Sequence, residues 1–306
     1  MRYTNGHYYS LNQFLQEKFG EKLYKISLDG GFTCPNRDGT VGTGGCIFCS
    51  AGGSGEFAVS LRDNIAEQIE SAKALVSHKT KSNRYIAYLQ SFTNTYAPIE
   101  YLEKLYRQIL NRDDIAALSV ATRPDCLDDD VIDLLDRLNR FKPLWVELGL
   151  QTIHESSAKY IRRGYPLAVY DNSVQRLINK NINVVTHVIL GLPCEDRDMM
   201  IDTVRYVGSS GVKGIKLQLL HVLRGTDLAN EYAAGRFETL SMNEYIDLLC
   251  ECIEILPENM VIHRLTGDGA KKILIAPLWS ADKKRVLNAI NAEFGRRNII
   301  QGSGWH

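Results

Sequence analysis

Short apolar runs alternate with longer amphipathic segments along most of the chain. The runs have strand length and end in polar or turn residues, which predicts β-strands at residues 24–28, 85–89, 115–121, 145–150, 182–190, 214–220 and 260–265. Between them, apolar residues recur with helical spacing, which predicts helices at residues 61–75, 99–110, 131–138, 156–161, 170–178, 199–207 and 242–256. The chain is therefore expected to fold as alternating strands and helices.

Strands that alternate with helices pair in parallel through right-handed crossovers. Such a chain forms a doubly wound sheet or a full or partial α/β barrel, and the pattern alone does not choose between them. In each of these folds the chemistry gathers at the carboxyl ends of the strands. The segments that follow the predicted strands are polar, at residues 29–31, 90–96, 122–125, 151–152 and 191–193.

The loop after the first predicted strand concentrates cysteine and glycine. Cys34, Cys46 and Cys49 have the spacing C-x11-C-x2-C, inside a glycine-rich stretch at residues 30–55. Glycine lets a backbone wrap tightly around an anion, and thiolates are the ligands of iron–sulfur clusters. Three thiols without an obvious fourth predict a [4Fe–4S] cluster with one iron open to a small molecule. A structural zinc site completed by His7 or Cys126 is the alternative.

The three-cysteine loop, with Phe48 just before its last cysteine, resembles the radical S-adenosylmethionine (SAM) superfamily. Its long first gap is similar to the branch related to the radical domain of the Elongator catalytic subunit, most closely the YhcC/YtqA-type subfamily. The resemblance implies an α/β fold, a partial (β/α)6 TIM-type barrel with an N-terminal cluster loop and a C-terminal α/β extension. It divides the chain into an N-terminal helical segment at 1–23, a barrel core at 24–225 and a basic extension at 226–306.

Five further motifs stand in the order that the resemblance requires. Residues 90–96 are similar to the segment that holds the methionine amine and carboxylate, 122–125 follow the third strand, and the glutamine that ends 147–152 contacts the ribose in related enzymes. The arginine of 161–165 suits a carboxylate through a bidentate fork, and 187–193 resemble a strand that packs on the adenosine. The cofactor contacts implied by the resemblance are Phe48, Gln90, Thr93, Asn94, Arg123, Gln151, Arg163 and His187.

The resemblance implies an enzyme in which a reduced cluster cleaves SAM to methionine and a 5'-deoxyadenosyl radical, which then abstracts hydrogen from a substrate. Relatives cluster around tRNA wobble-uridine modification, and the subfamily is MnmL-like. The expected substrate is the carbon-5 substituent of that uridine, with carboxymethylaminomethyl trimmed to aminomethyl. The expected partners are tRNA and a reductant such as flavodoxin or ferredoxin. The residue that handles the substrate and the oligomeric state are not predicted by the resemblance.

Charge changes this picture only locally. The chain has 36 Lys and Arg residues and 36 Asp and Glu residues, so its formal net charge is zero. This argues against a protein that binds nucleic acid over its whole surface. Residues 264–297 are nevertheless strongly basic. They predict RNA backbone contacts at Lys271, Lys272, Lys283, Lys284 and Arg285. A solvated helix face explains the same charges.

The remaining features narrow the class of protein. No apolar run reaches the ~20 residues that a membrane span needs, and the start lacks a secretory pattern, so a cytoplasmic protein is expected.

The other four cysteines, Cys126, Cys194, Cys250 and Cys252, are too scattered for a second cluster. Cys250 and Cys252 are expected in the core, and Cys194 is expected to pack rather than line a cavity. Two alternatives stand beside the main prediction. One is a radical SAM enzyme on a small molecule or protein, and the other is a non-catalytic cluster- or zinc-bearing binding module.

Overall fold

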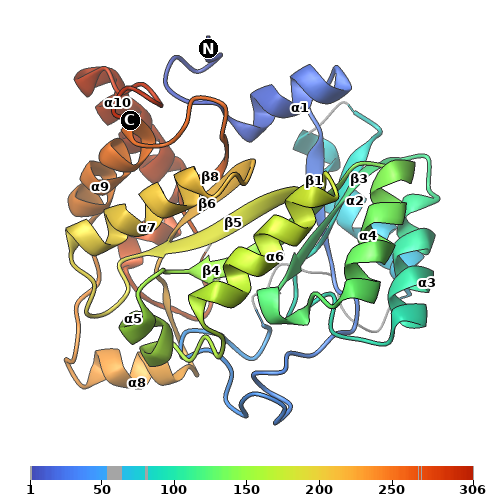
Figure 1. Ribbon diagram of the computed structural model, residues 1–306. Helices are drawn as coiled ribbons and strands as arrows, with labels where there is room; N and C mark the ends of the chain where they lie inside the picture. Colours follow the sequence, from blue (N-terminus) through green and yellow to red (C-terminus); the bar gives the residue numbers. More distant parts are fainter. Residues whose placement is uncertain (1, 54–63, 80–81, 268, 270, 306) are drawn as a thin grey trace.

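A single parallel sheet forms the centre of the computed structural model, which describes residues 2–53, 64–79, 82–267, 269 and 271–305. The sheet has seven strands in the order β1-β2-β3-β4-β5-β6-β8 and curls into a half-barrel (Figure 1). This confirms the α/β class and the partial barrel. The strands are β1 (Tyr24–Leu28), β2 (Tyr85–Leu89), β3 (Ile115–Thr122), β4 (Leu144–Gln151), β5 (Asn183–Leu190), β6 (Gly214–Leu219) and β8 (Val261–Arg264).

Most of the helices cover the outer, convex side of the sheet (Figure 1). The helices after β1 are α2 (Ile65–Val76), α3 (Ile99–Leu110), α4 (Asp129–Phe141), α5 (Glu155–Tyr160), α6 (Leu167–Asn179), α7 (Arg197–Ser209), α8 (Asp227–Ala233), α9 (Met242–Glu254) and α10 (Lys283–Arg297). Of these, α10 packs against α9, and α8 packs against the short strand that follows β6. Of the helix expected at 61–75, residues 61–63 lie outside the described part of the chain. Its described part begins after Asn64, whose side chain and that of Glu67 form a reciprocal capping box.

The amino end of the barrel is closed by an apolar layer. Trp145 and Val185 lie in one buried cluster with Ile86. Phe14 and Phe19 of α1 (Leu11–Phe19) pack against this cluster. Both aromatic rings meet Trp145 edge to face. The N-terminal helical segment thus plugs the barrel at the end opposite the cysteine loop.

The part of the chain after residue 225 continues the barrel instead of forming a separate layer. Strand β8 pairs in parallel with β6, and α9 packs against both α7 and α10. A small antiparallel pair, β7 (Val222–Leu223) and β9 (Leu274–Ala276), lies beyond the sheet. The barrel sheet thus takes its last strand from the segment expected as the C-terminal extension.

The two ends of the chain meet at the amino end of the barrel (Figure 1). Gln301 is buried there, and its backbone N–H donates to the His7 carbonyl at 2.8 Å. Its side chain accepts from the Tyr9 N–H at 2.8 Å and donates to the carbonyls of Pro257 and Met260. One glutamine side chain thus links the N-terminal segment to the loop before β8.

Candidate active site

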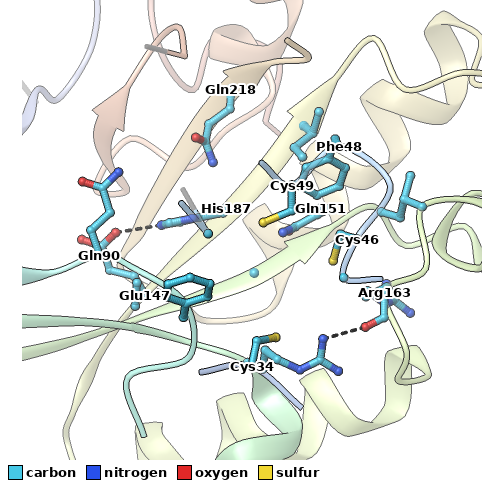
Figure 2. Close-up of a pocket in the computed structure, with 18 of the residues that line it drawn as sticks. Cys34, Cys46, Phe48, Cys49, Gln90, Glu147, Gln151, Arg163, His187 and Gln218 are labelled. Carbon is cyan, nitrogen blue, oxygen red and sulfur yellow. Dashed lines mark hydrogen bonds and ion pairs between the residues drawn. The ribbon is translucent and has the colours of Figure 1, made fainter. Parts of the chain in front are cut away.

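A cavity of ≈ 250 Å³ opens at the carboxyl ends of the strands, where the sequence places its polar segments. The three cysteines of the loop after β1 line it together with side chains from β2, β4, β5 and β6. Figure 2 shows Cys34, Cys46 and Cys49 on one side of this space, and Glu147 and Gln218 on the other. The structure therefore gathers in one place most of the site residues that the sequence predicts.

The cysteine loop is held in shape by its own backbone. The Cys34 carbonyl accepts from the N–H groups of Arg37 and Asp38, and the Cys46 carbonyl accepts from the Cys49 N–H. The Arg37 guanidinium donates to the carbonyls of Cys49 and Ser50, which ties the two halves of the loop together. These bonds fix where the thiols emerge without using the sulfur atoms.

The thiols present sulfur ligands in a low-dielectric setting. The Asn36 side-chain amide approaches Cys46 Sγ at 3.5 Å, a donor to sulfur of the kind that iron–sulfur clusters receive. Burial, together with the neighbouring Cys49, raises the pKa of Cys46 to about 12, so metal binding there must displace a proton. Each thiolate of a cluster binds a different iron, and the three thiols need not meet at one point.

A closed zinc site does not fit this arrangement. Among the described residues, no group of three or more His, Cys, Asp or Glu side chains is placed to hold a metal ion. His7 lies at the amino end of the barrel, where its Nδ1 contacts the Ile299 carbonyl at 2.9 Å. It therefore cannot complete the cysteine loop at the opposite end. Cys126, the other candidate, is buried with its Sγ 4.0 Å from Asp125 Oδ1 and does not line the cavity. The three thiols that do line it are ligands of the kind that an iron–sulfur cluster takes.

Gln151 has a buried side-chain acceptor that a bound ligand could satisfy. It ends β4 in the left-handed region at φ 67°, which is unusual for a residue with a side chain. Its Oε1 is buried and has no hydrogen-bond partner among the described residues. A buried acceptor without a donor costs free energy, so a hydroxyl of a bound molecule would complete it. The adjacent Gly149 leaves the amide room, because a Cβ there would lie 2.9 Å from Gln151 Nε2.

The two predicted arginines are engaged by the protein itself. Arg163 donates to the carbonyls of Leu150, Thr152 and Tyr165. Arg123 forms a bidentate pair with Asp125. Both arginines line the cavity. The Arg163 guanidinium also pairs with the Glu155 carboxylate at 3.2 Å, so the protein itself supplies partners to this group.

Of the other predicted cofactor contacts, some line the cavity and one lies behind its wall. Phe48, Gln90 and Thr93 line the cavity, and Gln90 contacts Ser27 Oγ at 3.1 Å. Asn94 does not line it, because its buried amide donates to the Ala121 carbonyl at 2.8 Å. Asn94 thus fastens the loop after β2 to the end of β3.

The floor of the cavity is a buried charged cluster around Glu147. Its Oε1 accepts from Lys25 Nζ at 2.5 Å and from Ser119 Oγ at 2.6 Å. Its Oε2 accepts from His187 Nε2 at 2.7 Å and from Lys216 Nζ. His187 therefore points at this carboxylate, as Figure 2 shows. Four donors saturate the two oxygens of one fully buried side chain.

The surroundings set the protonation of this cluster. Burial, with the nearby Lys216 charge, lowers the pKa of His187 to about 4, so the ring is neutral and donates through Nε2. Burial also lowers the pKa of Lys216 to about 7, since the charges of Lys25 and Arg264 oppose the attraction of Glu147. The two lysines hold the pKa of Glu147 well below its usual range, despite its burial.

Sequence reasoning missed most of this cluster. Lys25, Tyr88 and Lys216 stand at inward positions of apolar strands, and Gln218 faces the cavity two residues after Lys216. A lysine in the middle of a buried strand is the signal that identifies it, because such a charge requires a partner inside the barrel. Cys194, expected to pack, is instead exposed, while Cys250 and Cys252 are buried as expected.

The predicted RNA contacts stand outside the cavity. Lys271 and Lys272 are exposed in the loop after Gly267, which lines the cavity. Lys283, Lys284 and Arg285 are exposed in the first turn of α10. That helix follows Ser280, whose hydroxyl contacts the cavity residue His221 at 3.0 Å. Both basic groups thus belong to segments that border the open end of the barrel.

Comparison with known proteins identifies the family. The Radical SAM superfamily matches residues 37–207, and the Radical_SAM C-terminal domain matches residues 212–296. The chain is 48% identical to YtqA of Bacillus subtilis over 299 residues, 98% of this chain and 93% of that protein. It is 37% identical to YhcC of Escherichia coli over 270 residues, 88% and 86% of the two chains. Its fold is similar to that of Methanocaldococcus infernus Elp3, with a TM-score of 0.69 and 15% identity, over 91% of this chain and 64% of that one.

A parallel half-barrel with a thiol loop at its mouth defines an enzyme that works through an iron–sulfur cofactor. The chain belongs to the radical SAM superfamily, whose enzymes use a [4Fe–4S] cluster and SAM and require a reductant. This sets aside the non-catalytic binding module. No helix in the described part of the chain is long and apolar enough to cross a membrane.

Proposed function

We propose that Cys34, Cys46 and Cys49 bind the [4Fe–4S] cluster and that the enzyme modifies the carbon-5 substituent of the wobble uridine of tRNA. The observation that carries the first part is the opening of all three thiols onto one cavity at the carboxyl ends of the strands. When bound there, the cluster and SAM supply a 5'-deoxyadenosyl radical that removes a hydrogen atom from the substrate.

Different residues of the cavity wall have different roles in binding the cofactor. Gln151 offers its unpartnered Oε1 to a ribose hydroxyl, and Phe48 adds an apolar surface beside the thiols. Gln90 and Thr93 border the same space, while Arg123 and Arg163 hold its wall rigid. These residues bind and orient the cofactor and exclude water from the reacting centre.

The basic rim supports a nucleic-acid substrate. Three positive side chains occupy the first turn of α10, exposed on the surface, and the N-cap Asp282 accepts from the Arg285 N–H. Exposed lysine and arginine side chains are the groups that bind nucleic-acid phosphates. The N–H of Arg224 donates to the Ile273 carbonyl at 2.7 Å, which adds a third exposed cation beside Lys271 and Lys272. RNA phosphates would bind such a rim while one splayed base enters the cavity.

The resemblance to the Elongator branch supports wobble uridine as the target, and the fold similarity to the archaeal Elp3 agrees with it. The proposed conversion is that of carboxymethylaminomethyl to aminomethyl. Loss of a hydrogen atom and then an electron from the carboxymethyl carbon would leave an imine, and addition of water would break the C–N bond and release the two carbons as glyoxylate. SAM would be the two-electron oxidant, and flavodoxin or ferredoxin would supply the electron that starts its cleavage. A radical reaction on a small molecule or a protein is the alternative, and the following experiment separates the two.

The test is anaerobic reconstitution followed by reaction with dithionite and SAM, with and without tRNA bearing the modified uridine. We expect 5'-deoxyadenosine to form, tRNA to stimulate it, and the nucleoside to lose its carboxymethyl group by mass spectrometry. If 5'-deoxyadenosine accumulates but no tRNA is converted, the tRNA assignment is contradicted. A small molecule or a protein would then be the favoured substrate.

The rim is tested by the salt dependence of tRNA binding. Replacing Lys271 and Lys272 by alanine should lower the slope of log affinity against log salt by about 1 to 2. The matched control is a double alanine variant of Lys22 and Lys180, which are exposed at the amino end of the barrel. An equal change in both variants would show that the rim makes no specific contact.

A further inference from the structure

The inner part of the cavity places one carboxylate beside two cationic side chains. Glu147 is the sole carboxylate among the described lining residues, and its oxygens already accept four donors. Lys216 and Arg264 line the same space, in register with each other on β6 and β8. Glu147 is shared between Lys216 and Lys25, so it does not serve Lys216 alone.

Lys216 has one donor left for a ligand. Its Nζ donates to Glu147 and to the Tyr88 hydroxyl, the latter at 3.0 Å. An ammonium group has three N–H donors, and the third has no partner among the described residues. The side chain is only 5% exposed, so bulk water does not readily satisfy it. A buried cation with a spare donor facing a cavity is suited to a small anion.

We propose that Lys216, with Arg264 beside it, forms a carboxylate-binding subsite in the inner cavity that holds the acidic end of the substituent on uridine. The inference rests on the proposed function and adds to it the group by which the enzyme selects its substrate. Gln218, the next inward residue of β6, borders the same subsite and can donate an amide N–H.

A second carboxylate, that of the methionine part of SAM, has the same chemistry. It belongs near the thiols, because its expected partner is the open iron of the cluster. Figure 2 shows the three cysteines across the cavity from Glu147, the partner of Lys216. The placement therefore favours the carboxylate of the substrate.

The experiment compares two tRNA substrates in wild type and Lys216→Met. One carries 5-carboxymethylaminomethyluridine at the wobble position, and the other carries its methyl ester, which lacks the charge. Loss of a charge-assisted bond predicts a 10- to 100-fold lower kcat/KM for the acid, on the order of a buried ionic hydrogen bond. The ester does not use the ammonium charge, so its kcat/KM should fall at least about tenfold less than that of the acid, and the ratio of acid to ester turnover reports the subsite.

The matched control is Lys25→Met. It removes an ammonium group from the same carboxylate, yet Lys25 does not line the cavity. The ratio of acid to ester turnover should therefore stay at its wild-type value in this variant. Equal loss for acid and ester in Lys216→Met would give Lys216 a purely structural role and overturn the subsite.

A third measurement separates the two carboxylates. The KM for SAM is measured from formation of 5'-deoxyadenosine without tRNA in wild type and Lys216→Met. A raised KM for SAM in the variant would assign the subsite to the cofactor and overturn the proposal. Wild type that cleaves SAM but converts neither tRNA would contradict the proposed function, and the subsite with it. If wild type and both variants convert the acid and the ester with the same ratio of kcat/KM, only the subsite is refuted.

Discussion

The buried carboxylate at the floor of the barrel makes a quantitative prediction about stability. Glu147→Gln keeps the shape of the side chain but removes the charge that Lys25 and Lys216 share. Breaking a buried ion pair from one side costs about 3–5 kcal/mol, because the remaining charge is left without its counter-ion. The glutamine oxygen still accepts one donor, so we expect a loss of about 3 kcal/mol in the free energy of unfolding at pH 6.

The expected loss depends on pH through Lys216. Its native pKa, about 7, lies below the ~10.4 of an unfolded lysine, so the native state holds fewer protons between these values and wild type gains stability as the pH rises through that window. In the variant Lys216 has lost its counter-ion and is neutral in the native state down to lower pH. The two proteins therefore gain stability in parallel above pH 7, and their difference is larger at pH 6 than at pH 9.

Urea unfolding followed by tryptophan fluorescence measures this loss, since Trp145 lies in the apolar layer at the closed end of the barrel. The control is Glu21→Gln, which removes the surface partner of Arg84 and should cost at most about 1 kcal/mol. A loss below 1 kcal/mol for Glu147→Gln, or a difference that grows from pH 6 to pH 9, would refute the reasoning.

Three further outcomes follow from the site. Cys46→Ala should abolish cluster assembly, seen as loss of the visible absorbance of the reconstituted protein, whereas Cys250→Ala in the core should retain it; a full cluster in both variants would contradict the ligand assignment. Gln151→Ala should keep the cluster and weaken SAM binding in equilibrium dialysis, and loss of the cluster would show damage to the fold instead. Affinity for the acidic tRNA, relative to its methyl ester, should fall by up to tenfold per pH unit above about pH 7, where Lys216 must take up a proton to bind an anion. A ratio independent of pH would contradict this.

The fold was largely predictable because each strand and helix carries its own periodic pattern. Strand β3 is buried along its whole length and reads as a continuous apolar run, and α3 places Leu102, Leu105 and Ile109 on one buried face. Strands β7 and β9 were not predicted, since pairs of two or three residues carry no period. The place of β8 in the main sheet depends on pairing with β6, which no local pattern encodes.

The site was predictable where chemistry and spacing coincide, as in the cysteine loop. It was not predictable where a side chain can serve the protein or a ligand equally well. Arg163 has the residue type for a carboxylate, and in the structure it pairs with the protein's own Glu155 and with the carbonyls of Leu150 and Thr152. The Glu147 cluster was missed because its members come from strands far apart in the sequence and meet only when the sheet curls.

The buried Gln301 also has a consequence for the order in which the molecule is made. Synthesis proceeds from the amino end, so Tyr9 and α1 leave the ribosome long before the residue that fastens them. Contacts between residues nearly 300 positions apart form late, because the chain between them must first be ordered. The barrel can therefore be locked at its amino end only after residue 301 has been synthesised, and Gln301→Ala should slow this locking step of folding more than it alters the cavity.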